Sequence, residues 1–83
     1  MDEKIQQVIQ IIEGIVSDTT IPKNIRKALT DANERLKTEE ELNVKVSAAV
    51  YLIESVSDDI NMPAHARTQL WAVISSLESL KAG

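Results

Sequence analysis

The sequence contains no cysteine, one histidine (His65), two glycines and only two aromatic residues, Tyr51 and Trp71. The absence of cysteine excludes disulfide bridges, thiolate metal sites and cysteine nucleophiles. A single imidazole cannot supply the several His or Cys ligands that zinc requires. Two glycines are too few for a glycine-rich phosphate-binding loop, and no Walker or dinucleotide-binding motif is present. We therefore expect a protein that is not an enzyme and that has no cofactor and no metal.

Long hydrophobic runs are also missing. No run approaches the roughly 20 apolar residues of a transmembrane helix, and no signal-peptide pattern opens the chain. With 83 residues, 43% of them hydrophobic, the chain is expected to form one domain over residues 1–83. The net charge of −4 disfavours nonspecific binding to nucleic acid or to anionic membranes. We expect a cytoplasmic protein that has no membrane contact.

Apolar residues recur at spacings of three and four, which is the signature of amphipathic helices. No segment alternates with the period of two that a β-strand requires. The four apolar stripes consist of Ile5, Val8, Ile9, Ile12, Ile15 and Val16; of Ile25, Leu29, Ala32 and Leu36; of Leu42, Val46, Ala49, Val50, Ile53 and Val56; and of Ala66, Leu70, Val73, Ile74, Leu77 and Leu80.

Proline and capping residues set the expected helix boundaries. Pro22 and Pro63 suit the first turn of a helix, where the missing N–H is tolerated. Thr38 and Glu41 have the spacing of a capping box that would open the third helix. The helices are expected over residues 2–17, 22–37, 39–57 and 63–81.

The two halves of the chain resemble each other at an offset of 41 residues. Matched pairs include Asp18 with Asp59, Arg26 with Arg67, Ile21 with Met62, and Leu29 with Leu70. We interpret this as a duplication of one helix–loop–helix unit, residues 2–37 and 43–78. Because one hairpin cannot bury its apolar face alone, the pattern predicts an all-α four-helix bundle built from two tandem hairpins.

The repeated acid and arginine of each half suggest a structural contact. Asp18 precedes Arg26 across the first loop as Asp59 precedes Arg67 across the second. A charge-assisted hydrogen bond within each pair would fix the angle of its own hairpin.

Charge is unevenly distributed along the chain. The segment 23–37 has five basic and two acidic residues, whereas the segment 38–62 has six acidic residues and one basic residue. Two interpretations fit: the neighbouring helices attract each other, or the basic helix meets an acidic partner. The candidate basic patch consists of Lys23, Arg26, Lys27 and Arg35.

Positions at which the two halves differ are candidates for function. Asn33 matches Ile74 and projects onto an apolar stripe, where it either finds a partner or bonds to water at the stripe's edge. Trp71 matches Thr30 and lies at the margin of its stripe, either as a lid on the core or as an anchor for a partner. The candidate interaction surface consists of Tyr51, His65, Arg67 and Trp71.

Two segments carry a resemblance to a known family. They are Asn61-Met-Pro-Ala-His-Ala-Arg-Thr68, followed by Trp71, and Asp18-Thr-Thr-Ile-Pro-Lys-Asn-Ile-Arg-Lys27. Over nearly the whole chain the sequence resembles a small archaeal family, uncharacterised protein family 0147. The resemblance implies an archaeal, cytoplasmic, all-helical protein and directs attention to Asn24, Arg26, Asn61, Pro63, His65, Arg67 and Trp71. The second loop reads Asp59-Ile60 where the family pattern has Asp-Pro, which predicts a less rigid loop.

Two functions are compatible with these features, and an enzymatic function fits them less well. The first is a non-enzymatic interaction module that docks an unidentified protein and forms a homodimer, which would cover its surplus apolar side chains. The second is an accessory protein for nucleic acid or a phosphate ligand, using the basic second helix. An enzyme built on Asp59, His65 and Arg67 would require the three side chains to converge in a pocket.

Overall fold

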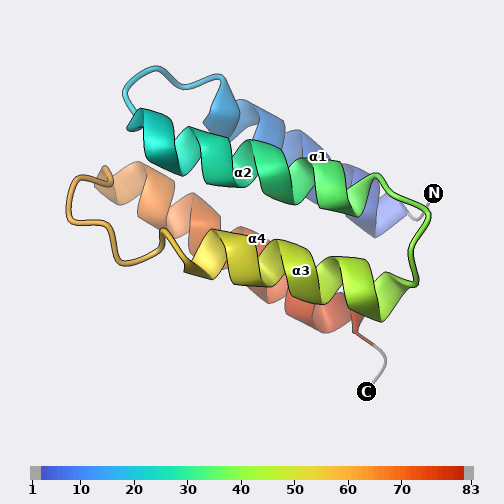
Figure 1. Cartoon of the computed structure of the whole chain (residues 1–83). Coiled ribbons are helices and arrows are strands. Elements are labelled where there is room, and N and C mark those ends of the chain that lie inside the picture. Colours follow the sequence, from blue (N-terminus) through green and yellow to red (C-terminus); the bar gives the residue numbers. More distant parts are fainter. Residues whose placement is uncertain (1–2, 82–83) are drawn as a thin grey trace.

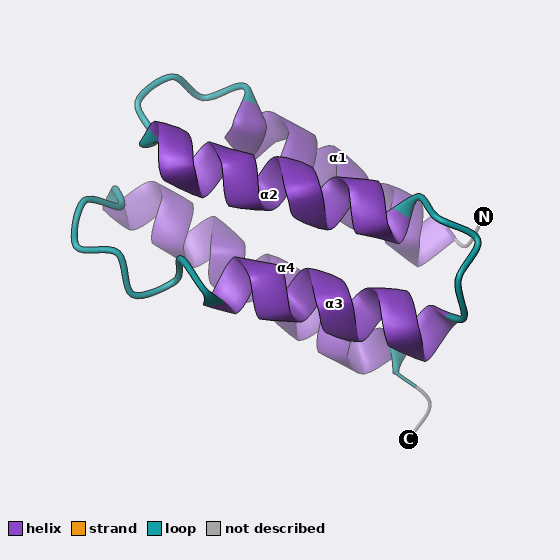
Figure 2. Cartoon of the chain, in the orientation of Figure 1, coloured by secondary structure: helices purple, strands orange, loops and turns teal. Residues whose placement is uncertain are grey.

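The computed structural model describes residues 3–81, and these residues form four helices and no strand. The helices are α1 (Glu3–Val16), α2 (Lys23–Leu36), α3 (Leu42–Glu54) and α4 (Ala64–Leu80) (Figures 1 and 2). The predicted all-α, four-helix architecture is confirmed.

The four helices form a square bundle about 33 Å long. α1 packs against α2 and α4, and α3 packs against the same two helices, so that α1 and α3 lie on one diagonal and α2 and α4 on the other. The loops inside the two hairpins, residues 17–22 and 55–63, lie at one end of the bundle (Figure 1). The connection between α2 and α3 lies at the opposite end, so segments about 40 residues apart in sequence meet at the loop end.

The core is aliphatic, as the scarcity of aromatic residues requires. Eighteen of its buried hydrophobic residues come from the four predicted stripes, and Ile21 and Met62 join them from the loops. Each of these two residues immediately precedes a proline that starts a helix. Burial of Ile21 and Met62 therefore holds both hairpin loops against the end of the core.

The two prolines stand one residue before their helices rather than within the first turn. Pro22 and Pro63 are the N-cap residues of α2 and α4, with ψ angles of 148°. The Pro22 carbonyl accepts from the N–H groups of Ile25 and Arg26, which closes the first turn of α2. The Pro63 carbonyl does the same for α4.

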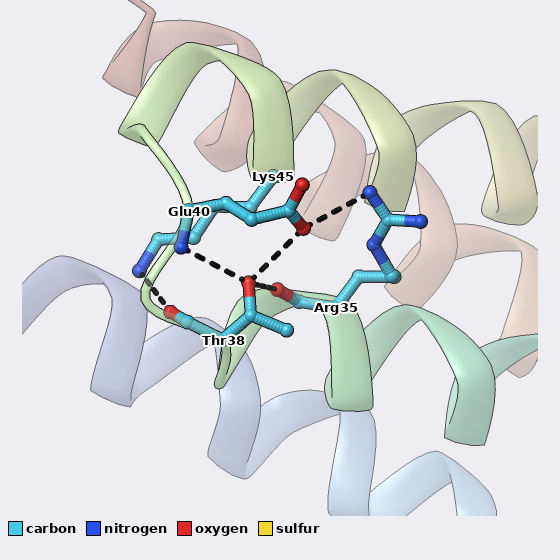
Figure 3. A network of polar contacts seen from close by, with 4 residues as sticks. All are labelled: Arg35, Thr38, Glu40 and Lys45. Carbon is cyan, nitrogen blue, oxygen red and sulfur yellow. Dashed lines mark hydrogen bonds and ion pairs between the residues drawn. The ribbon is translucent and has the colours of Figure 1, made fainter.

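The predicted capping box at the start of the third helix is wrong. α3 begins at Leu42, and the Thr38 hydroxyl instead donates to the Arg35 carbonyl at the end of α2, over 2.9 Å. Glu40 pairs with the Arg35 guanidinium at 3.1 Å, and the Lys45 ammonium donates to the Thr38 carbonyl (Figure 3). These contacts stabilise a turn in which residues 37–41 leave α2 and enter α3, so the segment is not free to form the first turn of a longer helix.

Candidate interaction surfaces

A side-chain contact joins the two hairpins at the loop end. His65 Nε2, in the first turn of α4, lies 2.9 Å from Asp18 Oδ2 in the loop after α1. Asp18 Oδ1 also accepts from the Thr20 hydroxyl at 2.6 Å and from the Thr20 N–H at 2.9 Å. The Thr20 hydroxyl and then His65 hold the pKa of Asp18 down at about 2. The carboxylate is therefore ionised at neutral pH and connects its own loop to α4.

A second contact runs in the opposite direction. Asn24 Nδ2, in the first turn of α2, donates to Asp59 Oδ2 over 3.0 Å, and Asp59 Oδ1 accepts from the Asn61 N–H over 2.8 Å. These two hydrogen bonds, that of Asn24 first, lower the pKa of Asp59. At the offset of 41 residues Asn24 matches His65, so matched positions make reciprocal contacts between the hairpins. The duplication itself stays a prediction.

The expected pairing of each aspartate with the arginine of its own hairpin is wrong. Arg26 Nε donates to the Ile21 carbonyl at 2.9 Å, and the Arg67 guanidinium lies 3.4 Å from the Asp59 carbonyl. Both arginines therefore bind main-chain oxygens of the preceding loop, while both aspartate side chains face the other hairpin. The prediction from charge complementarity thus named the wrong partners, because the two carboxylates contact His65 and Asn24.

Asp59, His65 and Arg67 do not converge as a catalytic group would. His65 contacts Asp18 rather than Asp59, and Arg67 reaches only the main chain of Asp59. A carboxylate–imidazole pair assists nucleophilic catalysis when a hydroxyl or thiol bonds to the other ring nitrogen. In residues 3–81 the nearby Thr20 hydroxyl bonds to Asp18 instead. The contact between His65 and Asp18 therefore connects the two hairpins.

Trp71 lies beside a surface hollow of about 410 Å³ on the second hairpin. We call this the Trp71 hollow; it is lined by Met62, Ala64, Arg67, Thr68 and Trp71. The Trp71 side chain is 57% exposed, so it does not act as a lid sealed over the core.

The structure brings together part of the predicted interaction surface. Arg67 and Trp71 share the Trp71 hollow, whereas His65 is directed to Asp18. Tyr51 is 74% exposed on α3 and is outside the lining of the hollow.

Most of the predicted basic patch lines a second hollow of about 490 Å³. We call this the α2 hollow; it is lined by Val16, Lys23, Asn24, Arg26, Lys27 and Thr30. Arg35 is not part of it, because this residue lies at the other end of α2 and pairs with Glu40. Sequence reasoning missed Val16 and Thr30 as members of this site, although Thr30 was identified as the counterpart of Trp71.

Asn33 is buried, with 6% of its surface exposed, rather than hydrated at the edge of its stripe. Its Nδ2 donates to the Ile9 carbonyl of α1 over 3.4 Å, and its Oδ1 has no partner. The amide thus connects α1 and α2 through one long hydrogen bond and leaves an acceptor unsatisfied.

Residues 3–81 hold no group of three or more His, Asp or Glu side chains that could bind a metal ion. In the same range, none of the helices is both long and apolar enough to cross a membrane.

Relatives of the chain come from several archaea. A UPF0147 protein of Pyrococcus furiosus is 42% identical over 83 residues, covering 98% of this chain and 89% of the relative. One from Methanocaldococcus jannaschii is 41% identical over 81 residues, covering 96% of this chain and 87% of the relative. One from Saccharolobus islandicus is 40% identical over 84 residues, covering 96% and 91%.

Two crystal structures have the same fold. The structure of MMP1188, a protein of unknown function, is 41% identical and superposes with a TM-score of 0.91, covering 96% of this chain and 92% of that one. A UPF0147 protein from Thermoplasma acidophilum is 32% identical with a TM-score of 0.89, covering 94% and 93%. Residues 1–80 also match the family described as Uncharacterised protein family (UPF0147). The resemblance found in the sequence is thereby confirmed: the chain belongs to this archaeal family.

Proposed function

We propose that this chain is a non-enzymatic helical interaction module of the cytoplasm that self-associates through the surface around Trp71. The exposure of Trp71 carries the proposal. A tryptophan with 57% of its surface exposed beside a hollow leaves a large apolar area in water. Tryptophan is enriched among the residues that dominate binding energy at protein interfaces, where it fills pockets of the partner.

Exposed large apolar side chains are concentrated on one hairpin. Among the described residues, Val44, Tyr51, Ile60 and Trp71 belong to α3, α4 or the loop between them, and only Ile11 belongs to the first hairpin. A random scatter of surface apolar residues needs no explanation, but a bias to one half of a small bundle supports a docking function for that half. A second copy of the chain would bury such residues by pairing like surfaces around a two-fold axis.

Sedimentation velocity over a wide concentration range tests the proposal. We expect the wild type to form dimers as concentration rises, and Trp71→Ala to weaken dimerisation by about 30-fold, the size of effect typical of a dominant interface residue. Ile11→Ala, which removes an exposed apolar side chain from the first hairpin, should leave dimerisation unchanged.

Circular dichroism of the three proteins checks that the variants keep their helices. A wild type that stays monomeric at several hundred micromolar overturns the proposal. So does a folded Trp71→Ala variant that dimerises as strongly as the wild type.

A further inference from the structure

The α2 hollow combines three cationic side chains with no acidic one. Lys23, Arg26 and Lys27 come from the first two turns of α2, and Val16 from the end of α1 contributes to the lining. The exposed lining of the hollow is mostly apolar. Long basic side chains commonly present an apolar stem to a surface and their charge at its rim.

The charges around this hollow are poorly neutralised by the rest of the chain. Among residues 3–81, Lys23 and Arg26 have no acidic partner. Lys27 pairs with Asp31 of its own helix at 3.6 Å, and the Lys27 side chain is 78% exposed. At the loop end of α2, the described residues 3–81 therefore place no carboxylate in ion-pair contact with Lys23 or Arg26.

The ion pair between α2 and the acidic segment lies at the other end of the helix. It joins Arg35 to Glu40, beside the connection to α3 (Figure 3). Of the two interpretations of the charge pattern, attraction between neighbouring helices thus applies to one end of α2 only. Uncompensated cations favour association with an anionic partner at the other end.

We propose that the α2 hollow binds a short acidic peptide segment that carries an aliphatic side chain. The carboxylates pair with Lys23, Arg26 and Lys27 at the rim, and the aliphatic side chain packs on Val16 and the lysine stems. This surface is distinct from the Trp71 hollow. The inference therefore goes beyond self-association and stands or falls separately from it.

A peptide fits this hollow better than a nucleic acid does. Nucleic-acid binding grows with the number of phosphates neutralised, and here only three cations converge on a chain of net charge −4. The lining contains no aromatic ring on which a base could stack.

The test is an NMR titration of ¹⁵N-labelled protein with an end-blocked peptide, Asp-Glu-Leu-Asp-Glu. We expect amide shifts over residues 16 and 23–30. The same peptide with serine in place of leucine should bind more weakly, and Lys-Lys-Leu-Lys-Lys should not bind. A single-stranded uridine oligonucleotide at equal salt is the nucleic-acid probe.

Variants assign the binding to the hollow. Lys23→Glu with Lys27→Glu should lower peptide affinity by roughly tenfold, because two attractions become repulsions. Lys45→Glu with Lys81→Glu makes the same change in net charge at the far end of the bundle and should change affinity less than twofold (Figure 1). The milder pair Lys23→Gln with Lys27→Gln serves if the first variant fails to fold. Trp71→Ala should bind the peptide as the wild type does, whatever it does to dimerisation.

Three results would overturn the inference. The first is no shift at millimolar peptide, and the second is an equal loss of affinity in the far-end variant, which would mean that net charge alone attracts the peptide. The third is tighter binding of the oligonucleotide than of the peptide at the same residues, which would assign the hollow to nucleic acid.

Discussion

His65 on α4 and Asn24 on α2 make reciprocal contacts, each with an aspartate in the loop of the other hairpin. His65 Nε2 lies 2.9 Å from Asp18 Oδ2, and Asn24 Nδ2 lies 3.0 Å from Asp59 Oδ2. Neither contact joins two residues of the same hairpin. Both hold one hairpin against the other at the loop end, beside the buried Ile21 and Met62.

Removing the imidazole should weaken the attachment of the second hairpin. We expect His65→Ala to lower the melting temperature by roughly 1–5 °C, since exposed polar pairs contribute little individually. His65→Asn should recover most of the loss, because an amide at the matched position 24 already makes this kind of contact. Thermal unfolding followed by circular dichroism measures both. Gln69→Ala, on the exposed side of α4, is the control, and an equal loss in that variant would contradict this role for His65.

The contact partners of Asp18 predict a pH dependence of stability. Its pKa is about 2 in the folded chain against an ordinary value of 3.8, so protonation favours the unfolded state. The stabilisation is therefore complete above pH 3.8 and is lost as pH falls towards 2. The difference in melting temperature between the wild type and Asp18→Asn should shrink from pH 5 to pH 2.

The difference in melting temperature between the wild type and Asp59→Asn should also shrink from pH 5 to pH 2, because the pKa of Asp59 is also lowered. If the wild type and Asp18→Asn differ by the same amount at pH 5 and pH 2, the carboxylate is not held by Thr20 and His65 as described.

Asn33 is a site at which the core can be improved. Leucine has the same branched shape as asparagine and no unsatisfied acceptor, and the matched position 74 is already isoleucine. We expect Asn33→Leu to raise the free energy of unfolding by about 1 kcal/mol, measured by urea denaturation. Ile74→Asn is the reverse change and should destabilise. Destabilisation by Asn33→Leu would show that the hydrogen bond to the Ile9 carbonyl outweighs the unpaired Oδ1.

Leu29 and Leu70 are matched core residues, each almost completely buried. Leu29→Ala and Leu70→Ala should each lower the free energy of unfolding by about 2–5 kcal/mol, through lost burial and the cavity left behind. Leu80→Ala, at a partly buried position, should cost clearly less. Chemical denaturation of the three variants checks the order, and a larger loss at Leu80 would contradict the assignment of the core.

The helices and the core could be predicted from the sequence because their signal is local. Residues such as Ile12, Leu29 and Leu70 recur at helical spacing, and burial of one face follows from that spacing alone. The predicted third helix, residues 39–57, extends beyond both ends of α3, which spans Leu42–Glu54. Thr38 and Glu41 match a capping pattern, but the Thr38 hydroxyl is used by the end of α2 instead.

The candidate surfaces were harder to predict because they depend on contacts between distant segments. Charge complementarity suggested Asp18 with Arg26, whereas the fold brings His65, 47 residues away, to the carboxylate. Three members of the basic patch do share a hollow, but Arg35 lies in the last turn of α2, outside the lining, and pairs with Glu40. The Val16 contribution to that hollow follows from how α1 packs on α2, which the composition of either helix does not reveal.

The fluorescence of Trp71, the only tryptophan of the chain, tests the proposed interaction surface most directly. In dilute protein the half-exposed indole should emit at the long wavelength of a hydrated ring. As concentration rises and copies associate, the emission should shift to shorter wavelength with the same midpoint as the rise in mass measured by sedimentation. Emission that stays unchanged while the mass doubles would place the dimer contact away from Trp71 and contradict the account.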